Sequence, residues 1–265
     1  MHPFEYVRPA DLDSAATVFG AADDARLLAG GMTLVPALKL RLSAPSMLLD
    51  LGGLPELRGI RGEAQGLTIG AMTTHAEVAA SADVQRLIPA LADLAGGIGD
   101  VQVRHRGTLG GSVANADPSA CYPAALLALG ATVVSTRRRI AAEAFFTGMF
   151  STALLAGEIV TAVHFPTPAA AAYEKFRSPA SRYALVGVFI ARTTAGVRVA
   201  VTGAAPCVFR AAAIEASLNE QFSPEAVAGL RFPPEGLNAD LHGDAAYRAQ
   251  LIGVLTRRAV ARLCS

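Results

Sequence analysis

Hydrophobic and polar positions alternate between two periods along the first fifty residues. Short apolar runs bounded by polar residues predict three strands, at residues 4–7, 25–28 and 47–51, of which the last is predicted to be buried. The apolar spacing of residues 11–22 predicts an amphipathic helix that Asp11 or Asp13 can cap. A second, shorter helix is predicted at residues 34–40. This order predicts a small lobe of mixed helix and strand.

From residue 57 onward the pattern changes. Residues 57–61 and 67–70 predict a hairpin, and the capping box that begins at Thr74 predicts the start of a helix. A helix is predicted at residues 84–95, followed by a polar connection. Further elements follow from the same patterns: a helix at 122–129 and strands at 132–135 and 158–165.

Two prolines followed by four alanines interrupt the pattern after residue 165. We interpret this stretch as an interdomain connection. The segment beyond it predicts three strands, at 173–177, 183–192 and 197–203, and then helices at 210–218, 224–229 and 244–263.

Composition and charge exclude several classes of function. Of the 265 residues, 52% are hydrophobic and 17% are charged, and the net charge is +1. No basic field favours nucleic acid. Three distant cysteines fit a reducing compartment better than a disulfide framework. We expect no signal peptide, no transmembrane segment and a cytoplasmic location.

Two glycine motifs carry the candidate chemistry. Residues 29–33 (AGGMT) and 108–115 (TLGGSVAN) each combine two glycines with hydroxyl side chains. Glycine lets the backbone approach a ligand, and consecutive N–H groups in a turn form a concave anion site. Two such turns can close on one dinucleotide pyrophosphate. The alternative for either motif alone is an ordinary tight turn.

Several common catalytic and nucleotide-binding motifs are absent from the sequence. There is no G-x-G-x-x-G, no P-loop, no H-E-x-x-H and no G-x-S-x-G. The five histidines show no metal-ligand spacing. The chain therefore offers a ligand cradle without an obvious acid, base or nucleophile, which is the pattern expected of a protein whose cofactor brings the chemistry.

The two motifs resemble those of a known family. Residues 27–36 with 39–42, and residues 106–118, are similar to the two flavin motifs of the FAD subunit of molybdenum hydroxylases, the family of carbon monoxide dehydrogenase medium subunits and xanthine dehydrogenase FAD domains. Residues 173–176, 179–184 and 201–206 resemble that family's C-terminal domain. The resemblance extends in order over nearly the whole chain.

This resemblance implies an α+β fold with two domains. The first is a two-lobed FAD-binding domain of the PCMH, or vanillyl-alcohol-oxidase, type at residues 1–168, with lobes at about 1–54 and 55–168. The second, at residues 173–265, is a smaller α+β domain with a three-stranded sheet and helices.

The resemblance also implies a function and partners. Family members carry FAD beside a molybdopterin-binding large subunit and a [2Fe–2S] small subunit, in a heterotrimer or its dimer. Electrons pass from the clusters through FAD to NAD, a quinone or oxygen. Two alternatives stay open from the residues alone, a flavin oxidoreductase that acts by itself and a flavin-free structural subunit on the same scaffold.

Carried over residue by residue, the resemblance predicts a cofactor site but no catalytic residue or metal ligand in this chain. The predicted cofactor-binding residues are Leu27, Leu28, Ala29, Gly30, Gly31, Met32, Thr33, Gly99, Thr108, Leu109, Gly110, Gly111, Ser112, Cys121, Ile159, Lys175 and Tyr183. Lys175 would place a positive charge near the flavin N1/O2 edge, and Tyr183 would lie near the isoalloxazine. The alternatives are a solvated strand lysine and an ordinary core tyrosine.

Two residues depart from the family pattern. Cys121 stands where the family commonly has aspartate, and a thiol is a poor substitute for a carboxylate that accepts hydroxyl hydrogen bonds. This puts a ribityl or ribose contact of the cofactor in doubt. Met32 stands where a polar residue is frequent.

Overall fold

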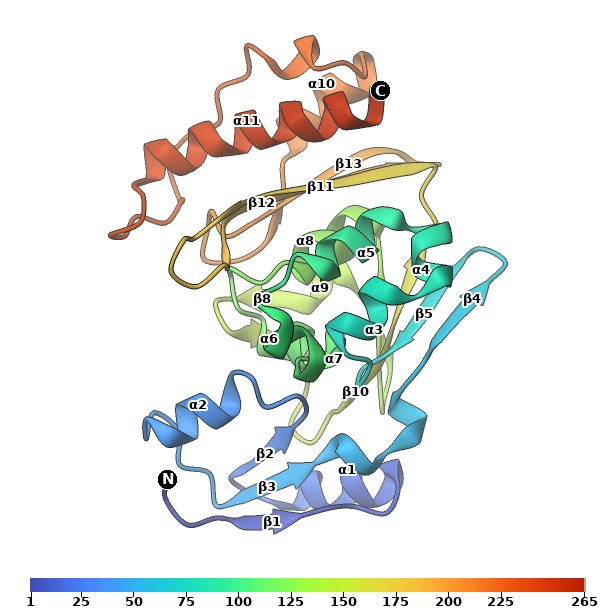
Figure 1. Ribbon diagram of the computed structural model, residues 1–265, viewed down its shortest axis with the longest axis vertical. Coiled ribbons are helices and arrows are strands. Elements are labelled where there is room, and N and C mark those ends of the chain that lie inside the picture. Colours follow the sequence, from blue (N-terminus) through green and yellow to red (C-terminus); the bar gives the residue numbers. More distant parts are fainter. Residues whose placement is uncertain (265) are drawn as a thin grey trace.

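The computed structural model describes residues 1–264 and places three main sheets along the long axis of the molecule (Figure 1). The N-terminal sheet is parallel, in the order β1-β3-β2, which places the last of the three strands in the middle. Its elements are β1 (Glu5–Val7), α1 (Leu12–Ala21), β2 (Ala25–Leu28), α2 (Leu34–Lys39) and β3 (Met47–Asp50). Every element predicted in this lobe is confirmed.

Helix α1 shows how the local sequence sets this lobe. Asp11 is the N-cap, and its carboxylate accepts from the backbone N–H of Ser14 at 2.8 Å in a capping box. Ala15, on the inner face of the helix, is completely buried and packs in one cluster with Leu49 and Leu51. Of the two predicted caps, Asp11 is therefore the one used.

The central sheet is antiparallel, in the order β4-β5-β10-β6-β7. Its strands are β4 (Ile60–Glu63), β5 (Gly66–Gly70), β6 (Thr132–Ser135), β7 (Arg139–Ala141) and β10 (Val160–Pro166). Around it lie α3 (His75–Ala80), α4 (Ala82–Leu87), α5 (Pro89–Gly96), α6 (Val101–Arg106), α7 (Leu109–Asn115), α8 (Tyr122–Leu129), α9 (Ala142–Phe145), and the small ribbon of β8 (Phe146–Gly148) and β9 (Ser151–Thr152). Helix α8 is buried over its whole length.

Two predictions in this part of the chain are wrong. The single helix predicted at residues 84–95 is two helices, because Pro89 begins α5 and Ile88 before it leaves the helical conformation. The predicted polar connection contains helix α6, which Asp100 caps by accepting from the N–H of Val103 at 2.8 Å.

The C-terminal sheet has four strands, where three were predicted. The strands β11 (Ala170–Arg177), β12 (Ala184–Thr193), β13 (Gly196–Thr202) and β14 (Phe209–Arg210) pair antiparallel in chain order. The fourth, β14, has only two residues, too short for a pattern to reveal. Strand β11 begins at Ala170, so the alanine run interpreted as a connection is partly strand.

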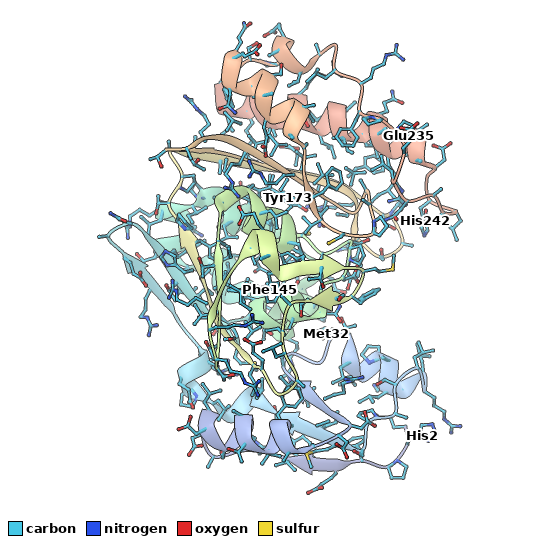
Figure 2. All side chains as sticks on the ribbon, turned by 180° about the vertical axis from the view of Figure 1, so that it is seen from behind. His2, Met32, Phe145, Tyr173, Glu235 and His242 are labelled. Carbon is cyan, nitrogen blue, oxygen red and sulfur yellow. The ribbon has the colours of Figure 1, made fainter. Side chains whose placement is uncertain are left out.

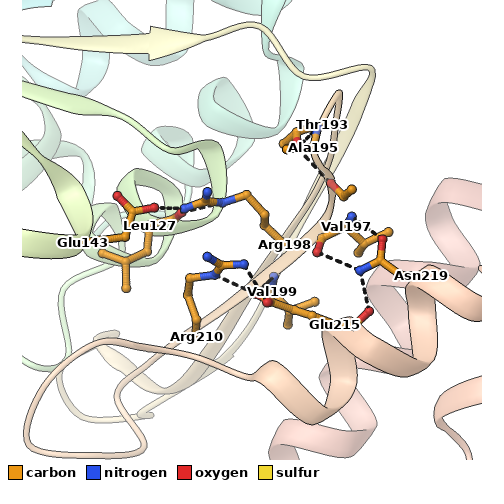
Figure 3. Close-up of polar contacts among 11 residues, drawn as sticks. Leu127, Glu143, Thr193, Ala195, Val197, Arg198, Val199, Arg210, Glu215 and Asn219 are labelled. Atoms are coloured by element: carbon orange, nitrogen blue, oxygen red, sulfur yellow. Dashed lines mark hydrogen bonds and ion pairs between the residues drawn. The ribbon is translucent and has the colours of Figure 1, made fainter.

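The C-terminal sheet is covered on both faces. Helices α10 (Ala212–Glu220) and α11 (Ala245–Cys264) pack on one face, and α5 and α8 of the central part pack on the other (Figure 1). Arg198 on β13 crosses this junction, donating to the carbonyl of Leu127 at 2.6 Å and pairing with Glu143 (Figure 3). None of the helices within residues 1–264 is long and apolar enough to cross a membrane.

The end of β13 also holds a connection in the central part. The Thr202 hydroxyl donates to the carbonyls of Pro118 and Ala120 at 2.8 and 2.7 Å, and the Gly203 N–H donates to Pro118 at 2.7 Å. The C-terminal sheet thus fixes the segment between α7 and α8.

Candidate functional site

A cavity of about 570 Å³ lies where the N-terminal, central and C-terminal parts meet. This volume falls within the range of about 300–1,000 Å³ common for ligand sites. Met32 lies at the junction of the N-terminal and central parts (Figure 2). The predicted site residues on the cavity wall are Leu27, Ala29, Gly30, Gly31, Met32, Thr33, Gly99, Thr108, Gly110, Gly111, Ser112, Cys121, Ile159, Lys175 and Tyr183.

Two predicted site residues are not on this wall. Leu28 ends β2, and Leu109 is completely buried in the central core cluster. The Leu28 side chain is half-buried, with its Cδ1 3.3 Å from where a Cβ on Gly31 would sit, and Leu109 packs into the core from the first turn of α7.

The first glycine motif is a turn, as predicted. Gly31 has a φ of +73°, a conformation that other residues rarely adopt, and its carbonyl accepts from Val35 N–H at 2.9 Å to begin α2. Within residues 1–264, the backbone N–H groups of residues 30–34 donate no hydrogen bond. These consecutive, unpaired donors form the kind of concavity that binds an anion.

The second glycine motif is not a turn, and the prediction of one is wrong. Thr108 caps helix α7, which places Gly110 and Gly111 in its first turn. The N–H groups of Leu109 and Gly110 donate to the carbonyls of Thr73 and Ala71 at 3.0 and 2.8 Å. These two donors are therefore already used by the protein, and the larger set of unpaired amides belongs to the first motif.

The two motifs touch each other. A Cβ atom on Gly30 would lie 2.1 Å from the Arg106 carbonyl oxygen, and one on Gly111 would lie 3.4 Å from the Ala29 Cβ. A distance of 2.1 Å leaves no room for a side chain. Segments separated by about eighty residues in the sequence are thus joined at one wall of the cavity.

The C-terminal part contributes Lys175 to the cavity wall. The Lys175 ammonium donates to the carbonyls of Gly97 and Arg182 at 2.8 and 3.3 Å, and it lies 3.4 Å from the Cys121 sulfur. Its neighbour Glu174 faces Arg262 instead, at 3.9 Å. Lys175 therefore points toward the cavity, and the alternative of a solvated strand lysine is wrong.

Cys121 and Tyr183 complete this side of the cavity. Cys121 is buried at the start of α8, next to the hydroxyl of Tyr173, whose pKa is raised by burial. Tyr183 is 44% exposed, which excludes an ordinary core tyrosine. Burial, the nearby Asp117 carboxylate and Cys121 raise the pKa of Tyr183, and its side chain lies beside that of Thr33.

The cavity wall contains residues that sequence reasoning missed. Asp117 lies on it, and burial raises the pKa of its carboxyl above the usual value although the Ser119 N–H donates to it. His75 lies on it as well, buried and with its Nδ1 unpartnered. The only sequence signal for His75 was its place directly after the cap residue Thr74.

The cavity fits a dinucleotide flavin. It combines unpaired amides at residues 30–34 for a pyrophosphate, a cation at Lys175 and apolar wall residues such as Ile159. Ligand sites are commonly apolar cavities with a few placed polar groups.

Comparisons with known proteins identify the family of this chain. A family model described as "FAD binding domain in molybdopterin dehydrogenase" matches residues 2–168. The chain is 35% identical over 274 residues to the carbon monoxide dehydrogenase medium chain of Hydrogenophaga pseudoflava, covering 97% of this chain and 96% of that one. It is 35% identical over 269 residues to the nicotine 6-hydroxylase medium subunit of Paenarthrobacter nicotinovorans, covering 96% and 95%.

A solved structure gives the same result for the fold. The quinoline 2-oxidoreductase of Pseudomonas putida 86 superposes with a TM-score of 0.89 at 31% identity, covering 99% of this chain and 97% of that chain. The resemblance noted from the sequence is confirmed. The chain belongs to the family of FAD-binding subunits of molybdenum-containing hydroxylases and dehydrogenases, and its cofactor is FAD.

Proposed function

We propose that this chain is the electron-transfer subunit of a molybdopterin-dependent hydroxylase or dehydrogenase. Its FAD would receive electrons from [2Fe–2S] clusters and pass them to NAD, a quinone or oxygen. The observation that carries the proposal is the cavity, which presents binding groups for a flavin dinucleotide: the unpaired amides of residues 30–34, the Lys175 ammonium and an apolar wall.

Different residues of the chain would bind different parts of the cofactor. The amides of residues 30–34 would receive the pyrophosphate, and the wall from Gly107 to Ser112 would close over it. FAD itself supplies the ability to take and release one or two electrons. No carboxylate in residues 1–264 lies within ion-pair distance of Lys175. Its positive charge would therefore stabilise negative charge on the reduced flavin ring.

The same proposal includes partners, location and domains. We infer a molybdopterin-binding large subunit and a [2Fe–2S] small subunit, in a heterotrimer or its dimer, in the cytoplasm. We also infer domains at residues 1–168 and 173–265, the first supported by the family match to residues 2–168.

The substrate belongs to the partner subunit. The names of the relatives described above refer to carbon monoxide, nicotine and quinoline, which are three different substrates. All three relatives are 31% to 35% identical to this chain. We therefore assign no substrate to this subunit.

One reconstitution separates the proposal from its alternatives. The chain is purified alone and with its two partner subunits, its flavin content is read from the visible spectrum, and flavin reduction by candidate substrates is followed without oxygen. The proposal predicts bound FAD that is reduced only when the partners are present. Reduction by the chain alone would indicate an independent oxidoreductase, and absence of flavin would indicate a structural subunit.

A further inference from the structure

His75 lies beside the second glycine motif and is held there by the backbone. Its N–H donates to the Gly107 carbonyl at 3.0 Å, and the Leu109 N–H donates to Thr73 at 3.0 Å. Thr74 and Thr108 form an antiparallel bridge between these two contacts. The segment that carries His75 therefore cannot move without moving the start of α7.

The two ring nitrogens of His75 have different surroundings. His75 as a whole residue is only 5% exposed, and Nδ1 is buried without a hydrogen-bond partner. Nε2 also has no hydrogen-bond partner within the described residues, but unlike Nδ1 it is not fully buried. It lies 2.7 Å from the place where a Cβ on Gly107 would sit. Because His75 lines the cavity, Nε2 is the nitrogen that reaches it.

Burying a histidine ring without a hydrogen-bond partner costs desolvation free energy, and no hydrogen bond within the described residues compensates for it. Tyr122 packs against the ring at 5.4 Å between centroids, and its hydroxyl is likewise buried and unpartnered. Burial, and then the charge of Arg104, lower the pKa of His75 to about 4, so the ring is neutral near pH 7. A neutral ring carries one N–H, and only Nε2 can offer it to a ligand in the cavity.

We propose that His75 is a cofactor-positioning residue whose Nε2–H donates a hydrogen bond to a pyrophosphate oxygen of FAD beside Gly107. This inference rests on the proposed placement of FAD in the cavity. It adds a donor at the second motif, where the Leu109 and Gly110 amides are already used.

The test is a titration of the apoprotein with FAD, followed by quenching of flavin fluorescence. His75→Phe should raise the Kd roughly three- to tenfold, as expected for loss of one hydrogen bond. His75→Gln, whose amide nitrogen reaches the Nε2 position, should stay within about twofold of wild type by the same scale. His75→Asn, whose amide reaches only the Nδ1 position, should behave like His75→Phe.

Two further readouts separate positioning from a structural role. The melting temperature of His75→Phe apoprotein should not fall, because the variant removes a buried polar atom without a partner. Riboflavin, which lacks phosphate, should bind wild type and His75→Phe equally.

Several results would overturn the inference. A wild-type Kd for FAD in His75→Phe would do so, as would equal losses in the Gln and Asn variants together with a lower melting temperature. An equal loss for riboflavin would remove the pyrophosphate contact. Failure of the wild-type protein to bind FAD would instead refute the proposed function.

Discussion

The ammonium of Lys175 on β11 lies 3.4 Å from the thiol of Cys121 at the start of α8, and both residues line the same cavity. Its other partners are two backbone carbonyls, those of Gly97 and Arg182. No carboxylate in residues 1–264 pairs with it. The positive charge of Lys175 is thus held in place without being neutralised by the protein.

We predict that Lys175→Ala retains oxidised FAD but lowers its reduction potential. A unit charge about 4 Å from the ring contributes at most about 4 kcal/mol at an effective dielectric of 20, and water reduces this. The expected decrease is on the order of tens of millivolts for a two-electron couple. An anaerobic redox titration measures it, with Lys175→Arg as the control that keeps the charge. A potential equal to wild type would remove Lys175 from the flavin site.

Replacement of Cys121 tests the departure from the family pattern. Cys121→Asp should tighten binding of oxidised FAD, because a carboxylate can accept from a cofactor hydroxyl, a gain of about 1.5 kcal/mol, or roughly tenfold in Kd. It should also lower the reduction potential, because the carboxylate would pair with Lys175. Cys121→Ser is the neutral control. Unchanged affinity and potential would indicate that the thiol is only a packing residue.

The contact between the motifs can be tested at Gly30. Gly30→Ala places a Cβ 2.1 Å from the Arg106 carbonyl oxygen, so the two motifs must separate. We expect FAD binding to be lost or weakened at least tenfold, which equilibrium titration would show. The matched control is Gly20→Ala in α1, where a Cβ meets nothing within 4 Å. Wild-type FAD affinity in a folded Gly30→Ala protein would contradict the site.

Acid stability depends on a buried carboxylate behind the cavity. Glu158 is 3% exposed. Burial by itself raises its pKa, but hydrogen bonds from Arg138, the Leu155 N–H and the Ser135 hydroxyl outweigh this and lower the pKa to about 2. The folded protein therefore binds the proton more weakly than the unfolded chain. The resulting stability is present above the ordinary pKa of 4.5 and is lost as pH falls from there toward 2.

Glu158→Gln should therefore destabilise the protein at pH 7 and flatten its loss of stability below pH 4.5. The upper limit is about 3 kcal/mol, from 1.36 kcal/mol per pH unit, and the exposure of Arg138 reduces it. Urea unfolding at a series of pH values measures both effects, with the exposed Glu220→Gln as control. Parallel pH profiles for Glu158→Gln and wild type would contradict this assignment.

The elements with strong local signals were predictable from the sequence. Asp11 and the Thr74 capping box marked helix starts because their hydrogen bonds join residues three apart. The strands β2 and β3 were visible as apolar runs. Helix α6 and strand β14 were not, since α6 has no buried residue and β14 has two residues that depend on pairing with β13.

Some features of the site were likewise predictable from the sequence, and others were not. The first glycine motif was predicted correctly as a turn, because Gly31 adopts a conformation set by its own backbone. The second was predicted wrongly, because tertiary hydrogen bonds to Ala71 and Thr73 hold its glycines in a helix. His75 was missed because its place under Gly107 depends on strand-like pairing of two distant segments.

The proposed position of FAD is the cavity between the two glycine motifs and Lys175. A crystal structure of the FAD-loaded protein tests it most directly. We predict that the pyrophosphate lies within hydrogen-bonding distance of the amides of residues 30–34, and that the N1/O2 edge of the flavin lies beside the Lys175 ammonium. A flavin bound outside this cavity, or with its phosphates away from residues 30–34, would contradict it.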